Sequence, residues 1–306
     1  MNGQPNKSSG MVSIVGRPNV GKSTLLNSLI GRKIAIVSKV PQTTRVQVRG
    51  VYNDERGQIV FIDTPGLHPH RDRLDEFMNR SADESARGAD CVIHLVDATD
   101  HTGPEEEELV RRLSRLSMPI ILGLNKVDLN AKHMSDYIAL WERVRGCPVT
   151  EFKDFTLLPL SAKGKTNIEK LRDILFEILP EGPPLYPQDM VSDTPKKMMI
   201  SDVIREKIYH RVRQEIPHSI AVMIEEMGMV KGGAFRIDAL VLVERDSQKK
   251  IVIGKKGENL KLAGTAARRE LEESLGQKVF LNLHVKVAQR WRESPSYLQD
   301  LGYDCI

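Results

Sequence analysis

The segment from Gly16 to Ser23 constrains the fold of this chain more than any other. It reads Gly-Arg-Pro-Asn-Val-Gly-Lys-Ser, which is the pattern of a phosphate-binding loop. Glycines at both ends let backbone N–H groups curve around a phosphate, Lys22 can reach the outer phosphates, and the serine hydroxyl can bind Mg²⁺. The apolar run 11–15 precedes the loop and the segment 24–30 has helical spacing. The anion is therefore predicted to lie at the N-terminus of a helix.

Length and composition indicate a globular protein of one or two domains. The chain has 306 residues, of which 40% are hydrophobic and 28% are charged. Its three cysteines are far apart and form neither a metal motif nor a disulfide framework, which fits a reducing cytosol. The polar N-terminus is not typical of a signal peptide, and no apolar run approaches the roughly 18 residues of a membrane span. We therefore expect a cytoplasmic protein.

Strands and helices are predicted to alternate through the first part of the chain, which favours a doubly wound α/β domain. The expected strands are 11–15, 47–53, 58–62, 91–97, 120–125 and 157–160. The expected helices are 22–30, 73–87, 104–116, 133–144 and 167–178. Four prolines between positions 180 and 187 then interrupt any regular structure. We therefore expect a first domain over 1–180, a linker over 181–197 and a second domain over 198–306.

Two segments after the loop are expected to complete a magnesium site. Asp63 ends an apolar strand, where its carboxylate can hold Mg²⁺ through water, and the backbone N–H of Gly66 can approach the γ-phosphate. In the segment 40–45, a threonine hydroxyl can complete the metal shell when the γ-phosphate is present. We expect Thr44 in this role, with Thr43 as the alternative.

Two later motifs predict recognition of guanine. The Asp128 carboxylate in Asn125-Lys126-Val127-Asp128 can accept hydrogen bonds from the N1–H and amino groups of guanine, a pair of donors that adenine lacks. Lys126 can lie along the base, and Asn125 can brace the phosphate loop. A backbone N–H in Ser161-Ala162-Lys163 can meet guanine O6. GTP is therefore expected as the nucleotide rather than ATP.

Together these motifs resemble the Era family of translation-factor-related GTPases. The resemblance is carried by the loop 16–23, by Gln42-Thr-Thr-Arg45, by Asp63-Thr-Pro-Gly66 and by Asn125-Lys-Val-Asp128. It implies a switch in which GTP and Mg²⁺ order the segments near 38–46 and 64–82, and hydrolysis to GDP and phosphate releases them.

The expected site residues fall into three groups. Expected to bind the nucleotide are Gly16, Arg17, Pro18, Asn19, Val20, Gly21, Lys22, Ser23, Thr24, Asp63, Thr64, Pro65, Gly66, Asn125, Lys126, Asp128, Ser161, Ala162 and Lys163. The expected Mg²⁺ ligands are Ser23, Thr44 and Asp63. Those expected to act in hydrolysis are Lys22, Asn19, Thr44 and Gly66.

Hydrolysis is predicted to be intrinsically slow. Leu67 stands where many GTPases carry the glutamine that orients the attacking water. We interpret Arg45, Arg71 and Arg73 as solvated switch residues rather than arginine fingers. In related GTPases with Pro-Asn in the phosphate loop, the asparagine helps to bind K⁺ beside the phosphates. The resemblance therefore implies a K⁺ site at Asn19, with an asparagine that only shapes the loop as the alternative.

The histidines near the switch are not expected to form a site. His68 and His70 flank a proline, and we interpret them as loop residues rather than as a metal pair or a general base. His94 lies within an expected buried strand, where we predict a core histidine with its hydrogen bonds satisfied.

The second part of the chain has the element order of an RNA-binding domain. A helix over 201–215, strands over 219–229 and 234–245, a pair of helices and a strand over 278–287 are expected. The two helices are separated by Gly254-Lys255-Lys256-Gly257. The pattern resembles a type II KH domain, whose Gly-x-x-Gly loop clamps the backbone of about four single-stranded nucleotides. The residues expected to contact RNA are Gly254, Lys255, Lys256, Gly257, Ile253, Lys249, Lys250 and Lys261.

The distribution of charge supports RNA binding by the second part of the chain. Residues 196–306 carry 20 Lys and Arg against 15 Asp and Glu, whereas the whole chain has a net charge of only +4. The second part is therefore where a polyanion would bind. Trp291 follows its last expected strand, and we predict that it packs in the domain, with base stacking as the alternative.

The predicted fold class is thus α/β, a doubly wound P-loop GTPase domain followed by a smaller α+β type II KH domain. The family resemblance implies a GTPase that binds 16S rRNA near its 3′ end and assists assembly of the 30S ribosomal subunit, and we expect it to be a monomer. Two alternatives stay open. One is a membrane-associated or stress-response GTPase, whose basic second domain would contact the inner face of the cell membrane. The other is an RNA chaperone whose nucleotide site only stabilises the fold.

Overall fold

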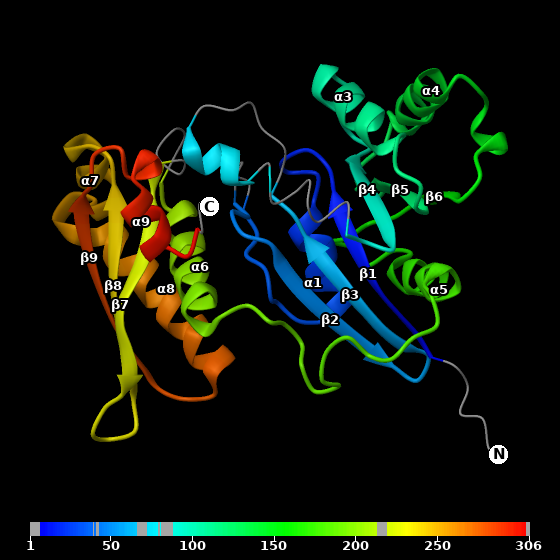
Figure 1. Cartoon of the computed structure of the whole chain (residues 1–306). Helices are drawn as coiled ribbons and strands as arrows, with labels where there is room; N and C mark the ends of the chain where they lie inside the picture. The colour runs from blue at the N-terminus through cyan, green and yellow to red at the C-terminus, as the bar shows by residue number, and fades with distance from the viewer. Residues whose placement is uncertain are drawn as a thin grey trace, which may run out of the picture. The chain divides into compact units, whose positions relative to one another are not determined.

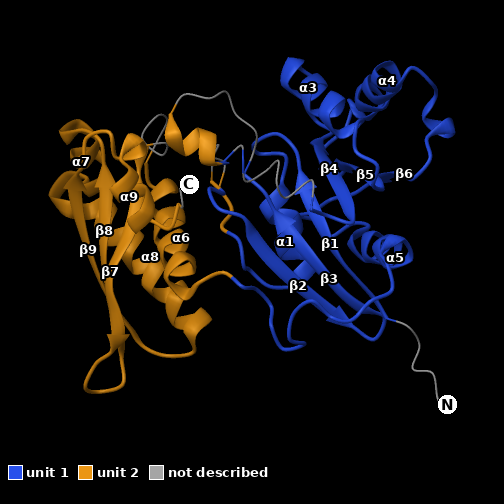
Figure 2. Ribbon diagram, in the orientation of Figure 1, with its two compact units in different colours: residues 1–35, 44–68, 78–193 blue, residues 36–43, 69–77, 194–306 orange. Residues whose placement is uncertain are grey.

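The computed structural model describes residues 7–38, 40, 43–65, 72–78, 80, 88–212 and 219–303. Contacts between residues divide the chain into two compact units, coloured separately in Figure 2. The first unit comprises residues 1–35, 44–68 and 78–193, and the second comprises residues 36–43, 69–77 and 194–306. Residues 181–193, which the sequence indicates as linker, therefore cluster with the first unit.

The first unit is built on a six-stranded sheet with the order β2-β3-β1-β4-β5-β6 (Figure 1). Its strands are β1 (Ser8–Val15), β2 (Val48–Asp54), β3 (Gly57–Asp63), β4 (Cys91–Asp97), β5 (Ile120–Asn125) and β6 (Phe155–Pro159). Strands β1 and β3 to β6 are parallel, and β2 pairs antiparallel with β3 along the edge. The sheet is therefore mixed, with a parallel body.

Helices cover both faces of this sheet, which confirms the doubly wound architecture. They are α1 (Lys22–Ile30), α3 (Pro104–Leu113), α4 (Met134–Arg145) and α5 (Ile168–Ile178), with a short 3-10 turn at Val149–Glu151. Ile93 and Leu95 pack in a core with α1 and α5, whereas Val92 and Val96 pack in a second core with α3 and α4. Because successive strand side chains point to opposite faces, the continuous apolar run of β4 serves both cores. Of the expected helix 73–87, residues 73–78 are helical, and most of the remainder lies outside the described residues.

The proline-rich segment runs along the β2–β3 edge of the same sheet. The Val51 N–H donates to Val191 O at 2.8 Å, and Arg49 forms an ion pair with Asp193 at 3.1 Å. The buried Gln58 side-chain oxygen accepts the backbone N–H groups of Leu185 and Tyr186 at 2.7 and 2.8 Å. Prolines prevent a regular strand here, and the segment is instead held by scattered backbone and side-chain contacts with β2 and β3.

The second unit contains a three-stranded sheet with the order β7-β8-β9. Its elements are α6 (Lys196–Tyr209), β7 (Ala221–Met229), β8 (Phe235–Val243), α7 (Asp246–Ile253), α8 (Glu258–Leu275), β9 (Val279–Val287) and α9 (Pro295–Asp300), with 3-10 turns at Lys255–Gly257 and Trp291–Glu293. Strand β8 is antiparallel to β7 and parallel to β9. Residues of α6, α7 and α8 pack with those of the strands in one core. This order of elements confirms the predicted α+β fold.

Two predictions about single buried residues are also confirmed. Trp291 is fully buried and its indole N–H donates to Ser219 O at 2.8 Å, so it packs in the second unit. His94 is fully buried, with Nε2 2.8 Å from Glu106 Oε1 and Nδ1 accepting from the Trp141 indole at 3.2 Å. Both ring nitrogens are satisfied, as a core histidine requires.

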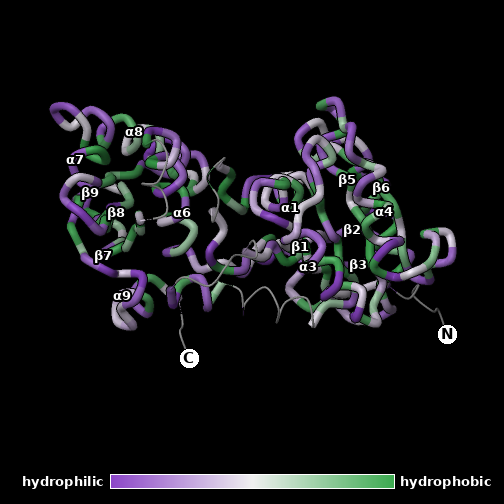
Figure 3. Tube along the Cα trace, turned by 90° about the horizontal axis from the view of Figure 1, so that it is seen from above, coloured by the Kyte–Doolittle hydropathy of each residue, from purple (hydrophilic) through white to green (hydrophobic). Residues whose placement is uncertain are grey.

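Hydropathy follows the same plan in both units. Figure 3 shows hydrophobic residues concentrated along the strands and hydrophilic residues along the connecting loops. Among the described residues, no helix combines the length and the apolar character needed to cross a membrane.

Candidate nucleotide and RNA-binding sites

Most of the predicted nucleotide motifs follow parallel strands of the first unit. The loop at 16–21 follows β1, Asp63 ends β3, Asn125 ends β5, and Ser161 comes just after β6. Because these strands are parallel, their carboxyl ends meet at one edge of the sheet. The fold therefore gathers segments that are up to about 145 residues apart in the sequence.

The phosphate loop has a backbone that only glycine permits at two positions. Gly16 has φ of 153°, and a Cβ there would lie 2.2 Å from Leu95 O. Gly21 has φ of 107°, and its Cβ would lie 2.5 Å from the Asn125 side-chain nitrogen. Between them, Asn19 adopts a left-handed conformation with φ of 64°. Helix α1 begins at the next residue, Lys22, so the loop ends at a helix N-terminus that suits an anion.

The Lys22 side chain is buried against the backbone of the loop. Its ammonium is buried and donates to Gly16 O at 2.8 Å and to Arg17 O at 3.0 Å. Burial lowers the pKa of Lys22 to about 8, although the nearby Asp63 carboxylate acts in the opposite direction. A phosphate beside this ammonium would favour its charged form.

Three oxygen donors converge at the start of α1 and the end of β3. Ser23 Oγ donates to Asp63 Oδ2 at 2.6 Å, and Thr44 Oγ1 lies 2.9 Å from Ser23 Oγ and 3.2 Å from the same carboxylate oxygen. Within the described residues, the buried Asp63 Oδ1 has no hydrogen-bond partner. Burial raises the pKa of Asp63, and a bound cation would favour its charged form. This set of hard oxygens fits Mg²⁺.

The alternative threonine is directed elsewhere. Thr43 is buried, and its hydroxyl donates to Val40 O at 2.5 Å. Of the two threonines, the structure therefore brings Thr44 to Ser23 and Asp63.

The segments after β5 and β6 support the loop from its other side. The Asn125 side chain donates to Val20 O at 2.7 Å and accepts from Ala162 N at 2.9 Å, joining three motifs through one amide. Lys126 donates to Asn19 O at 3.1 Å and forms an ion pair with Asp97. Its long side chain thus spans from the guanine motif to the phosphate loop.

The remaining guanine-motif residues differ in exposure. Asp128 and Lys163 are exposed at this edge, while Ser161 and Ala162 are buried. The Ser161 hydroxyl accepts from Gly164 N at 2.7 Å and so shapes the turn. Thr64 and Pro65 are buried behind the site, and the Thr64 hydroxyl donates to Ile14 O at 2.9 Å.

The predicted RNA loop lies between α7 and α8 in the second unit. Gly254 has φ of 75° and ψ of 176°, a conformation almost restricted to glycine, and Lys256 and Gly257 follow in left-handed conformations. The Asn259 side chain donates to Ile251 O at 2.9 Å across the loop. The lysines at 250, 255, 256 and 261 are exposed, and Lys249 and Ile253 are half-buried. The loop therefore presents several positive charges to solvent on a rigid turn.

The second unit also holds two segments that the sequence assigns to the switch. In the 36–43 segment, Thr43 O accepts from Arg205 Nη2 at 2.8 Å, and the Val37 N–H donates to Glu206 Oε1 at 3.0 Å. Arg205 and Glu206 both belong to α6. In the 72–77 segment, Arg292 forms ion pairs with Asp72 at 2.6 Å and with Asp75 at 3.2 Å.

Comparison with known proteins places this geometry in a family. A model for "50S ribosome-binding GTPase" matches residues 11–126, and a KH domain model matches residues 215–292. GTPase Era of Heliobacterium modesticaldum is 42% identical over 303 residues, which cover 97% of each protein. The chain belongs to the Era family of GTPases. GTPase Era of Carboxydothermus hydrogenoformans is 43% identical over 296 residues, covering 96% of this chain and 97% of that protein.

Solved Era structures agree with both units. A Tyr-to-Ala variant of Aquifex aeolicus Era bound to GDP·AlF4⁻ is 38% identical, with a TM-score of 0.90 over 97% of this chain and 100% of that one. Era in complex with MgGDPNP and nucleotides 1506–1542 of 16S ribosomal RNA is also 38% identical, with a TM-score of 0.91 over 98% of this chain and 100% of that one. These Era relatives therefore bind a guanine nucleotide, in one case with Mg²⁺ and rRNA.

Two supporting carboxylates, Asp97 and Glu106, were not among the predicted site residues of this Era-family chain. Asp97 pairs with Lys126, and its place at the carboxyl end of β4 could have identified it. The side chain of Arg17, which was predicted to bind the nucleotide, instead meets Glu106 Oε2 at 2.7 Å and His101 O at 3.1 Å. Although burial raises the pKa of Glu106, His94 and Arg17 lower it overall, so its carboxylate stays ionised behind the loop.

One interpretation of an Era-family switch arginine is wrong. Arg45 was expected to be solvated, but it is only 1% exposed. Arg73 is exposed, as expected. The predictions for Gly66, Leu67, His68, His70 and Arg71 lie outside the described residues, as does Gln42.

Proposed function

We propose that this chain binds and hydrolyses GTP, and that its nucleotide state times its grip on the 3′ region of 16S rRNA during assembly of the 30S subunit. One observation carries the proposal. Thr44 meets Ser23 and Asp63, while its neighbour Thr43 is held by Arg205 of the KH-containing unit. Of two consecutive residues in one loop, Thr44 thus contacts the proposed Mg²⁺ ligands and Thr43 contacts α6 of the unit that contains the KH domain. A change at one is passed to the other through the chain.

Each nucleotide contact has a defined role in this proposal. The loop amides from 16 to 23 and the Lys22 ammonium hold the phosphates, and Ser23, Thr44 and Asp63 hold Mg²⁺. The metal supplies charge neutralisation at the β- and γ-phosphates. Asp128 selects guanine through its two donors. Because the Ala162 N–H already donates to Asn125, the Lys163 N–H is the available donor for guanine O6.

Slow hydrolysis and dependence on K⁺ are part of the same proposal. With Leu67 in place of a polar residue, no side chain at that position can orient water, so the intrinsic rate stays low. The exposed Asn19, at the turn of the loop, would supply a K⁺ ligand beside the phosphates. The GTPase rate is measured in KCl and NaCl at equal ionic strength, with Asn19→Asp as the control. Equal rates in both salts would rule out the K⁺ site.

The RNA contact follows from the loop 254–257. Its exposed lysines would clamp the phosphates of a short single strand, and Ile251, with 46% of its surface exposed, offers an apolar contact for a base. The rRNA bound to the Era relative gives the proposed target, and the 30S subunit is the assembly that contains it. One copy of the chain is sufficient for GTP and RNA binding, because both units are in one chain. Its proposed location is the cytoplasm, where ribosomal subunits assemble.

The proposal is tested by measuring coupling between the two sites. Affinity for an RNA of the 16S 3′ end is compared in the GDP state and in the state with a non-hydrolysable GTP analogue. We expect a difference of about fivefold or more, and an equal change in nucleotide affinity when RNA is bound. Arg205→Ala should reduce this factor without abolishing either binding event, whereas Arg111→Ala, at an exposed ion pair with Glu107, should not.

Two outcomes would contradict the proposal. Identical RNA affinity in both nucleotide states would leave no switch. If Lys22→Ala weakened stability but left RNA remodelling unchanged, the nucleotide site would be a structural element of an RNA chaperone.

A further inference from the structure

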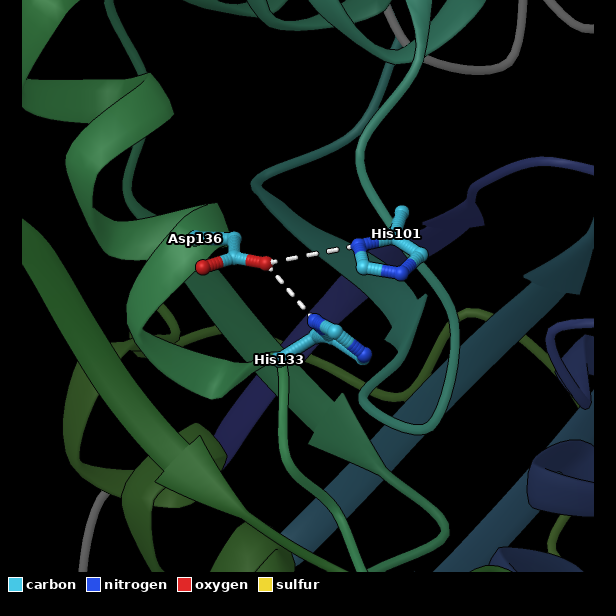
Figure 4. Close-up of side chains that lie close together, drawn as sticks. All are labelled: His101, His133 and Asp136. Atoms are coloured by element: carbon cyan, nitrogen blue, oxygen red, sulfur yellow. Dashed lines mark hydrogen bonds and ion pairs between the residues drawn. The ribbon is translucent and has the colours of Figure 1, made fainter.

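We propose that His101, His133 and Asp136 form a binding site for a divalent transition-metal ion of the Zn²⁺ class. Figure 4 shows the three side chains turned toward one another in the first unit. His101 lies in the loop between β4 and α3, His133 immediately precedes α4, and Asp136 is in the first turn of that helix. The proposed site is separate from the Mg²⁺ ligands at Ser23, Thr44 and Asp63, and it does not rest on the proposed GTPase switch.

The distances bracket those of a tetrahedral metal site. One ligand atom from each residue lies within 4.8 Å of the others. His133 Nδ1 is 2.8 Å from Asp136 Oδ2, and His101 Nδ1 is 3.9 Å from the same oxygen. Metal bonds of about 2.0–2.1 Å in a tetrahedral arrangement separate neighbouring ligand atoms by about 3.3 Å. Small rotations of the three side chains would therefore bring all ligand atoms into range.

The two imidazoles lie close to each other and to the carboxylate. Their ring centroids are 3.8 Å apart at an interplanar angle of 50°, with the carboxylate oxygen beside both. This arrangement suits a metal ion, because two imidazoles and a carboxylate can bind the same ion.

The backbone around the ligands is fixed by hydrogen bonds. The His133 N–H donates to Ala98 O at 3.0 Å, which joins the start of α4 to the loop after β4. The carbonyl of His101 accepts from Arg17 at 3.1 Å. The ligands are thus presented by a supported framework, and only their side chains need to adjust.

Ligand chemistry and exposure define the kind of ion. Two imidazoles and one carboxylate suit Zn²⁺ and neighbouring ions such as Co²⁺ and Ni²⁺, whereas Mg²⁺ prefers oxygen ligands and octahedral geometry. The side chains of His101, His133 and Asp136 are 77%, 20% and 41% exposed. A bound ion would therefore keep at least one position open to water or to an outside ligand, as in sites with three protein ligands.

The test is a Zn²⁺ titration of the full chain loaded with GDP in excess Mg²⁺, followed by calorimetry. We expect one equivalent to bind with a dissociation constant in the micromolar range or below. His101→Ala, His133→Ala and Asp136→Asn should each weaken binding about tenfold or more. His284→Ala is the matched control, because it removes an exposed histidine from β9 in the other unit and should change nothing.

A Co²⁺ titration reports the ligands directly. In the wild-type protein we expect the visible d–d bands of four- or five-coordinate Co²⁺, without the charge-transfer bands that cysteine thiolates give. These d–d bands should be lost in His101→Ala. GDP affinity and circular dichroism establish that each variant is folded. Zn²⁺ binding that is unchanged in both histidine variants, or that requires millimolar Zn²⁺ in the wild-type protein, would overturn the proposal.

Discussion

The phosphate loop after β1 and the Gly254–Gly257 loop after α7 both end at a helix start, yet they are built differently. The first is enclosed, because Lys22 is buried and Asn125 fills one side of the loop. The second is open, because the lysines at 255 and 256 are exposed. A compact terminal phosphate can be enclosed by fixed donors, whereas a continuous polynucleotide must pass over a surface.

This difference predicts how each loop responds to change. In the enclosed loop, Gly16 and Gly21 lie against Leu95 and Asn125 of the first unit, so a methyl group added at either glycine would displace the loop. In the open loop, charge contributions are spread over several lysines and each is screened by salt. The following predictions are ordered from the largest expected effect to the smallest.

The strongest test of the enclosed loop is Gly16→Ala. Its Cβ would lie 2.2 Å from Leu95 O, so the loop must move away from β4. We expect GDP affinity to fall about a hundredfold or more, equivalent to about 3 kcal/mol, in a titration with fluorescent GDP. Gly146→Ala is the control for a positive-φ glycine outside the loop, because Gly146 has φ of 75° and no atom lies within 4 Å of the added Cβ. Equal loss of GDP affinity in both variants would show that the contact with Leu95 is not the cause.

The two glycines of the open loop are expected to differ. At Gly254 a Cβ would lie 2.7 Å from Asn259 Cγ, whereas at Gly257 it would meet no atom within 4 Å. Gly254→Ala should therefore weaken RNA binding about tenfold or more, and Gly257→Ala about fivefold at most, through strain of about 1 kcal/mol. Filter binding with a short single-stranded RNA measures both. GDP affinity should be unchanged in both variants. A loss of GDP affinity would contradict the expectation that the two loops bind their ligands independently.

The enclosed loop should also bind its nucleotide in a pH-dependent way. Burial lowers the pKa of Lys22 to about 8 in the free protein, and a bound phosphate raises it again. The Lys22 contribution to affinity is therefore complete below about pH 8 and falls as the pH rises through that value, by up to about tenfold per pH unit. GDP titrations from pH 7 to 9 measure this dependence. In Lys22→Arg the side chain stays charged throughout this range. GDP binding by this variant should be weaker, and the part of the pH dependence that arises from Lys22 should be absent.

The smallest single effects are expected at the exposed lysines. Lys255→Gln and Lys256→Gln should each weaken RNA binding only about threefold to fivefold, and each should lower the slope of log affinity against log salt by about 0.7. Fluorescence anisotropy at several KCl concentrations measures both quantities. Lys153→Gln, an exposed lysine of the first unit, should leave the slope unchanged. If one lysine substitution lowered RNA affinity a hundredfold, binding energy in the open loop would depend on a single residue, as it does in the enclosed loop.

The fold could be predicted from the sequence to a large extent. Apolar runs such as 91–97 indicated strands buried on both faces, and the order of elements after position 198 indicated the KH arrangement. The antiparallel pairing of β2 with β3 was not predicted, although the few residues between the two expected strands are too short for the crossover that a parallel pair requires.

In the candidate site too, some features could be predicted from the sequence and others could not. Each motif states its own chemistry, so the phosphate loop, Asp63 and Asn125 could be named from their residue types alone. The choice of Thr44 over Thr43 was less certain, since the two are neighbours with the same hydroxyl, and only the direction of each side chain separates them. The burial of Arg45 was missed for the same reason.

By itself, the sequence determined the local requirements of this protein: which backbone turns need glycine, which strands are apolar, and which side chains can meet phosphate, guanine or RNA. These requirements lie within a few consecutive residues, where the chain states them directly. Only the tertiary structure decided which distant residues meet, such as Arg205 with Thr43, Gln58 with the proline-rich segment, and His101 with His133 and Asp136. Such pairs depend on the path of the whole chain, and no short pattern encodes that path.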